Sequence, residues 1–82
     1  MALNVLLVDD EYLVLKGLEI ILSEQTETSV KIVTAMDVED ALNKLTSFRP
    51  DVIITDINMP ESNGFELIKQ AQQNFRHCRF II

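Results

Sequence analysis

The sequence predicts an α/β fold in which a parallel sheet carries helices on both faces. Two short apolar runs, 3–8 and 52–55, have the length and β-branched content of buried strands. Segments with the apolar periodicity of helices separate these runs from two further strand-like segments. Strands that alternate with helices are typical of a parallel sheet. We therefore expect the order strand, helix, strand, helix, strand, helix, strand.

The first strand leads into an amphipathic helix. Residues 11–24 place apolar side chains at helical spacing, while Lys16 and Glu19 fall on another side. Glu11 is expected in the first turn, where its charge complements the helix dipole. The predicted apolar stripe consists of Val14, Leu18, Ile21 and Leu22.

The second strand, 30–35, contains polar Lys31 and Thr34, a pattern that favours the edge of a sheet over its centre. Asp37 follows as the predicted N-cap of a second helix. Pro50 closes this segment, because the residue before a proline is disfavoured in the helical conformation. The apolar positions of the helix repeat at helical spacing, at Val38, Ala41, Leu42, Leu45 and Phe48.

The third strand is followed by a loop, 57–62, and by a third helix. Asn63 and Glu66 have the spacing of a helix capping pair. A fourth strand is predicted at 79–82, and its apolar end is unsuited to a free edge. We therefore expect an interior strand, and a chain that is the N-terminal part, 1–82, of a larger and here incomplete domain. The predicted buried stripe of the third helix is Leu67, Ile68, Ala71 and Phe75.

Composition argues against several classes of protein. The chain has 82 residues and a net charge of −6, from 13 acidic and 7 basic side chains. This acidic balance argues against a nucleic-acid-binding protein, whose binding surface has clustered Lys and Arg residues. No apolar stretch reaches the roughly 20 residues of a membrane span, and the start lacks the basic region of a signal peptide. A single cysteine, Cys78, excludes an internal disulfide framework. These features favour the reducing cytoplasm.

Asp9, Asp10 and Asp56 are the residues from which chemistry is predicted. The first two follow the first strand, and Asp56 follows the third. Parallel strands end at the same edge of a sheet, where ligands bind, so neighbouring strands would bring the three carboxylates together. Like charges at that distance repel each other, and Mg²⁺, which prefers oxygen ligands, removes the conflict. Single aspartates at strand ends are also common helix caps, and one of the first pair could serve in that way.

A carboxylate beside a metal ion can attack phosphorus and become an aspartyl phosphate. Asp56 is the candidate nucleophile, because it stands alone at its strand end and the following loop could admit a phosphoryl donor. Asp9 and Asp10 are the candidate residues for holding the metal.

Two segments, 5–11 (VLLVDDE) and 50–60 (PDVIITDINMP), resemble the receiver domain of bacterial two-component response regulators. Gly64 follows them at the matching place, and the likeness covers the chain in order and spacing. It implies a flavodoxin-like sheet of strand order 2-1-3-4-5. It also implies a signalling phosphoacceptor rather than an enzyme, with Mg²⁺ as cofactor and a sensor histidine kinase as the phosphate donor.

The resemblance implies a role for each site residue. Asp56 would accept the phosphoryl group and bind the metal, Asp10 would be a direct metal ligand, and Asp9 would act through water. The main-chain carbonyl of Asn58 would complete the ligands that the protein supplies. The residues implied to shape the loop after Asp56 are Met59, Pro60 and Gly64.

Other receiver features would lie beyond Ile82: a Ser or Thr after strand four, an aromatic residue and a Lys on strand five, and the last two helices. Without them an apolar surface would face water, so we do not expect a stable monomer. The fourth strand could pair with another copy of the chain, or an exchanged element could complete the sheet. The motifs are similar to those of receivers joined to AraC-type DNA-binding domains, which implies an output domain that regulates transcription.

Two other functions compete with signalling. A Mg²⁺-dependent phosphohydrolase with an aspartyl nucleophile typically has Asp-x-Asp after its first strand, whereas Asp9 and Asp10 are adjacent. A flavin-binding relative of flavodoxin would need a phosphate loop rich in Ser, Thr or Gly at that place. The acidic segment 9–11 has the wrong charge for such a loop.

Overall fold

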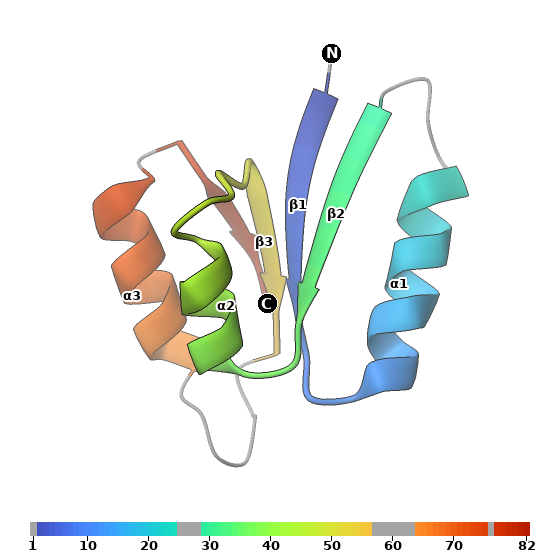
Figure 1. Ribbon diagram of the computed structural model, residues 1–82, viewed down its shortest axis with the longest axis horizontal. Coiled ribbons are helices and arrows are strands. Elements are labelled where there is room, and N and C mark those ends of the chain that lie inside the picture. Colours follow the sequence, from blue (N-terminus) through green and yellow to red (C-terminus); the bar gives the residue numbers. More distant parts are fainter. Residues whose placement is uncertain (1, 25–28, 57–63, 76) are drawn as a thin grey trace.

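The computed structural model of the protein describes residues 2–24, 29–56, 64–75 and 77–82. Four parallel strands form one sheet in the order β2-β1-β3-β4. Helix α1 covers one face of the sheet, and α2 and α3 cover the other (Figure 1). The predicted α/β fold is confirmed. The elements are β1 (Ala2–Val8), α1 (Tyr12–Glu24), β2 (Ser29–Ala35), α2 (Val38–Lys44), β3 (Val52–Thr55), α3 (Gly64–Asn74) and β4 (Arg79–Ile81).

The central strands are buried on both faces, and their successive residues face opposite helical layers. Leu6 and Ile53 belong to the core beneath α2 and α3, and both are fully buried. Val5 and Leu7 point to the other side, where they pack with Leu15 of α1. A strand that is covered on both faces typically has a continuous apolar sequence. This explains why polar and apolar residues do not alternate along β1.

Helix α1 turns a different face to the sheet than the sequence predicts. Leu15 is buried on β1, and Leu18 and Leu22 pack beside it, so these two members of the predicted stripe are confirmed. Val14 and Ile21 are 38% and 55% exposed, and their predicted burial is wrong. They form a second line on the helix that also has helical periodicity. Packing against the sheet, which periodicity does not report, selects between the two lines.

Helix α2 begins as predicted. The side chain of Asp37 accepts a hydrogen bond from the Asp40 amide at 2.7 Å, which caps the helix. At the other end, the Lys44 ammonium group donates to the Thr34 carbonyl of β2 and to the Asp40 carboxylate. β2 lies at the edge of the sheet, as its polar residues predict. The predicted apolar positions all belong to the core beneath α2 and α3 or pack against it: Val38, Ala41, Leu42, Leu45 and Phe48.

Helix α3 follows the predicted stripe, with Leu67 and Ala71 buried and Phe75 packed against the same core. Ile68 is half-buried. Asn63, the predicted capping residue, lies outside the described residues.

Strand β4 pairs with β3 and is the outer strand at the edge of the sheet opposite β2. Its last residue, Ile81, is 54% exposed, and Ile82 after it is 70% exposed. An apolar outer strand is an unusual edge. The expected interior position of this strand in a larger sheet stays a prediction.

Candidate functional site

The acidic residues lie where two neighbouring strands end. β1 pairs with β3 in parallel, and in this register Val8 lies beside Thr55. Asp9 and Asp56 therefore leave the sheet at the same edge. The Asp56 amide donates to the Val8 carbonyl at 3.0 Å, and the Asp9 amide donates to the Ala35 carbonyl at 3.1 Å. The predicted convergence of the two strand ends is confirmed.

The chain turns sharply from β1 into α1. The Glu11 amide donates to Asp9 Oδ1 at 2.9 Å, and the Glu11 carbonyl accepts a hydrogen bond from the Leu15 amide at 3.2 Å. Glu11 thus lies just before the helix, which begins at Tyr12, one residue later than predicted. Asp9 combines two roles that the sequence left open, because it supports this turn and also lies among the converging carboxylates.

Asp9, Asp10 and Asp56 form an acidic cluster, in which each residue brings a carboxylate oxygen within 4.8 Å of the other two. Asp9 and Asp56 are half-buried, and Asp10 is exposed. Mg²⁺ binds oxygen at about 2.1 Å in an octahedron, so two of its ligands lie about 3 Å apart when adjacent and about 4.2 Å apart when opposite. The observed spacing, within 4.8 Å, is close to the larger of these values. Donor type, spacing and charge therefore fit a hard divalent cation.

A hollow of about 270 Å³ opens beside the acidic cluster. Asp9, Thr55 and Asp56 are among the residues that line it. The hollow therefore offers acidic oxygens next to space for a small group. Its apolar walls come from β1, α1, β3 and the residue after β4, through Val8, Leu15, Leu18, Ile54 and Ile82.

Thr55 is a member of this site that sequence reasoning treated only as a strand residue. It is 2% exposed, and its hydroxyl donates to the main-chain carbonyl of Asp56 at 3.2 Å. The signal in the sequence is small: a single hydroxyl at the last position of an apolar run, directly before the aspartate.

The family model of the response regulator receiver domain matches residues 5–82, nearly the whole chain. The chain belongs to the response regulator receiver domain family. The resemblance carried by the two aspartate segments is thus confirmed, and the chain is a receiver of two-component signalling.

Several known proteins are similar to the receiver. The uncharacterized transcriptional regulatory protein YhcZ of Bacillus subtilis is 31% identical over 80 residues, which are 98% of the receiver and 37% of YhcZ. The response regulator TrrA of Thermotoga maritima, solved in complex with Mg²⁺-BeF, is 31% identical, with a TM-score of 0.85 over 98% of the receiver and 67% of TrrA. TrrA in complex with the histidine kinase ThkA gives a TM-score of 0.81 and 31% identity, over 95% of the receiver and 65% of that chain. The receiver thus spans little more than a third of the length of YhcZ.

The loop residues predicted to act beside Asp56 fall mostly outside the described ranges. This applies to Asn58, Met59 and Pro60, whereas Gly64 is the first residue of α3. Within the described ranges, none of the helices has both the length and the apolar character that crossing a membrane requires.

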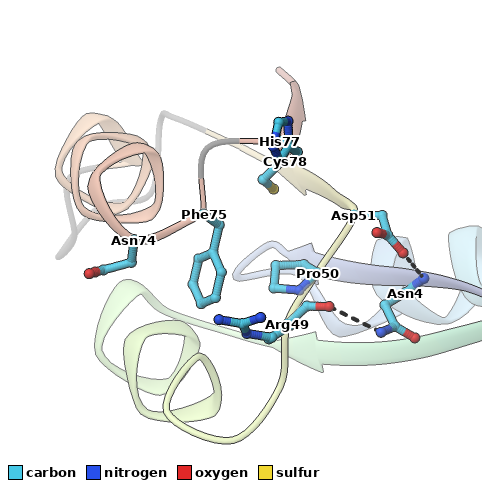
Figure 2. Close-up of a pocket in the computed structure, with 8 residues that line it drawn as sticks. All are labelled: Asn4, Arg49, Pro50, Asp51, Asn74, Phe75, His77 and Cys78. Carbon is cyan, nitrogen blue, oxygen red and sulfur yellow. Dashed lines mark hydrogen bonds between the residues drawn. The ribbon is translucent and has the colours of Figure 1, made fainter.

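A second hollow, of about 430 Å³, lies at the opposite ends of the strands, on the amino side (Figure 2). There Asn4 joins β1 to the residue that precedes β3. The Asn4 amide donates to Asp51 Oδ2 at 2.8 Å, and the Asp51 amide donates to the Asn4 carbonyl at 2.7 Å. The Asn4 side chain also donates to the Arg49 carbonyl at 3.0 Å. These bonds fix the strand ends opposite the acidic cluster.

Cys78 lines this second hollow and is half-buried. Burial raises the pKa of the Cys78 thiol, and the negative charge of Asp51 raises it further. The reactive form of cysteine is the thiolate. Cys78 is therefore not an activated nucleophile.

Proposed function

We propose that the receiver accepts a phosphoryl group on Asp56 in a Mg²⁺-dependent reaction, and so controls the output of a larger regulator. The observation that carries this proposal is the acidic cluster, with three carboxylate oxygens within 4.8 Å of one another at the carboxyl edge of the sheet. Membership of the receiver family supports the same reaction.

The proposed roles follow the donor set and the resemblance to other receivers. Asp10 and Asp56 bind the ion directly, and Asp9 acts through a water molecule. The main-chain carbonyl of Asn58 is the remaining ligand from the protein. The residues proposed to shape the loop between Asp56 and α3 are Met59, Pro60 and Gly64.

In the proposed step, a carboxylate oxygen of Asp56 attacks the phosphorus of the donor and forms a new P–O bond. The bond between phosphorus and the leaving group breaks, and the leaving group keeps the electron pair. Mg²⁺, when bound, supplies neutralisation of the phosphoryl oxygens. Backbone hydrogen bonds to neighbouring strands hold Asp56 and Asp9 before the donor arrives, and such preorganisation lowers the entropic part of a barrier.

We assign the phosphate donor to a sensor histidine kinase and the output to a DNA-binding domain outside this chain. The complex of the similar TrrA with the histidine kinase ThkA supports the first assignment. The name of YhcZ, a transcriptional regulatory protein, supports the second. In this proposal, 1–82 is the N-terminal part of a receiver that acts in the cytoplasm, and the isolated chain self-associates through β4.

Phosphorylation by acetyl phosphate, followed by mass spectrometry of the intact chain and its peptides, tests the proposed reaction. We expect one phosphoryl group per chain, located on Asp56, formed only with Mg²⁺ and released by hydroxylamine. Asp56→Asn should abolish the modification, because an amide is not a nucleophile for this reaction.

Glu24→Gln provides the matched control. It also replaces a carboxylate by an amide, at an exposed residue that ends α1 far from the acidic cluster (Figure 1). This variant should be modified like the unaltered chain. A label that persists in Asp56→Asn, or one that resists hydroxylamine, would contradict the proposal, and turnover of a phosphate ester would favour a phosphohydrolase.

A further inference from the structure

Thr55 places a hydroxyl in an apolar layer. Thr55 is 2% exposed, and among the described residues it is the only buried residue with a polar side chain. Ile53, on the same face of β3, is fully buried, and Val8 lies beside Thr55 on β1. A hydroxyl in such surroundings is unfavourable unless it forms a hydrogen bond. Valine would fill nearly the same space without that requirement, so packing alone does not explain the hydroxyl.

The hydrogen bond of Thr55 acts on the residue after it. The hydroxyl donates to the carbonyl oxygen of Asp56 at 3.2 Å, while the amide of Asp56 donates to the Val8 carbonyl at 3.0 Å. Asp56 is therefore held on both sides of its Cα atom. The pairing of β3 with β1 ends at Thr55, so this bond continues the restraint one residue past the regular strand pairing.

We propose that Thr55 is a positioning residue for Asp56, whose hydroxyl fixes the Asp56 backbone and thereby keeps its carboxylate within reach of the ion shared with Asp9 and Asp10. This inference rests on the metal-binding part of the function proposed for Asp56. Sites of this kind need their side chains held within about 0.5 Å of the productive geometry. Rotation of the backbone at residue 56 would move one of the three oxygens away from the other two.

Three substitutions separate the hydroxyl of Thr55 from its methyl group. Thr55→Ser keeps the hydroxyl and removes the methyl, Thr55→Val does the reverse, and Thr55→Ala has neither. For each variant, Mg²⁺ affinity is measured by titration of the amide NMR signals, and the rate of phosphorylation by acetyl phosphate is measured separately. The thermal unfolding midpoint, recorded in parallel, reports on packing.

Mg²⁺ affinity should follow the hydroxyl. We expect the Ser variant to remain close to the unaltered chain. The Val and Ala variants should bind about threefold to tenfold more weakly, which corresponds to about 0.7–1.4 kcal/mol at 1.4 kcal/mol per tenfold change. The unfolding midpoint should instead follow buried volume, with Val at or above the unaltered chain and Ser and Ala below it. A purely structural role would not separate the two measurements in this way.

Affinities that follow volume, that are equal in all four proteins, or that fall equally in all three variants would overturn the positioning role. The Ser and Ala variants both lack the methyl group, so their comparison decides the question even if the Val variant folds poorly. Affinity that depends on the hydroxyl, in a chain that takes up no phosphate, would keep the positioning role and refute the proposed phosphoacceptor function. An unaltered chain that binds no Mg²⁺ would overturn both.

Discussion

Contacts of single residues hold Asp56 in the acidic cluster. Its amide is bound by the Val8 carbonyl, and its own carbonyl accepts the Thr55 hydroxyl. Asp9, on the neighbouring strand end, also accepts the amide of Glu11. The cluster thus combines charges that repel one another with backbone positions that hold them together. That conflict is the physical reason to expect a cation.

At the opposite strand ends, the raised pKa of the Cys78 thiol gives a prediction for single residues. Burial and the charge of Asp51 raise its pKa, so the pH midpoint of alkylation by iodoacetamide should lie higher in the folded chain than in the urea-unfolded chain. Asp51→Asn should lower this midpoint, because it removes the charge but keeps an oxygen that can accept from Asn4.

The same shift predicts the sign of a pH effect on stability. The folded state holds the thiol proton more tightly than the unfolded state, so the contribution of Cys78 is fully present below the ordinary pKa of cysteine. It is lost as the pH rises above that value, and Cys78→Ala should remove this alkaline slope from the free energy of unfolding. A folded-state midpoint at or below that of the unfolded chain would contradict the argument.

The convergence of Asp9, Asp10 and Asp56 could be predicted from the sequence, because parallel strands end at one edge of a sheet whatever the details of packing. The turn bond from Glu11 to Asp9 and the hydroxyl bond of Thr55 could not. Each depends on the rotamer of one side chain and the dihedral angles of one residue, and neither leaves a periodic trace in the sequence.

Among the elements, α1 shows where sequence periodicity fails. Leu15, Leu18 and Leu22 face the sheet, whereas Val14 and Ile21 remain exposed. Both lines are apolar and helical in spacing, so the pattern predicts a helix correctly but does not fix its rotation about its axis. The capped start of α2 was predictable because Asp37 acts within a single turn.

Strand β4 leads to a prediction about association. It is an outer strand of the sheet, and both Ile81 at its end and Ile82 directly after it are more than half exposed. Unpaired edges with apolar side chains favour pairing with another chain. Sedimentation velocity should therefore show reversible dimers at micromolar concentration, and Ile81→Lys should shift the chain to monomers, because a charge on an edge strand opposes pairing.

Leu13→Lys on α1 is the control for that experiment. Leu13 is 82% exposed, so this variant adds the same charge to an apolar surface outside β4 and should leave dimers intact. Monomers at every concentration, or dissociation by Leu13→Lys alone, would show that β4 is not the contact.

For the whole molecule, strand order has the largest effect on function. The order β2-β1-β3-β4 makes β1 and β3 neighbours, although α1, β2 and α2 separate them in the sequence. This arrangement brings Asp56 to Asp9 and Asp10. A sheet in which strands followed their sequence order would place β2 between β1 and β3 and leave Asp56 one strand away from the other two aspartates.

Mg²⁺ titration followed by amide NMR tests most directly whether the three carboxylates share one ion. We expect one Mg²⁺ per chain, with the first and largest shifts at Asp9, Asp10 and Asp56, and an affinity that falls at least about tenfold in Asp10→Asn, consistent with the loss of a direct charged ligand. Glu24→Gln should bind Mg²⁺ like the unaltered chain. Saturable binding that is unchanged by Asp10→Asn, or shifts centred on residues away from these strand ends, would contradict a shared site.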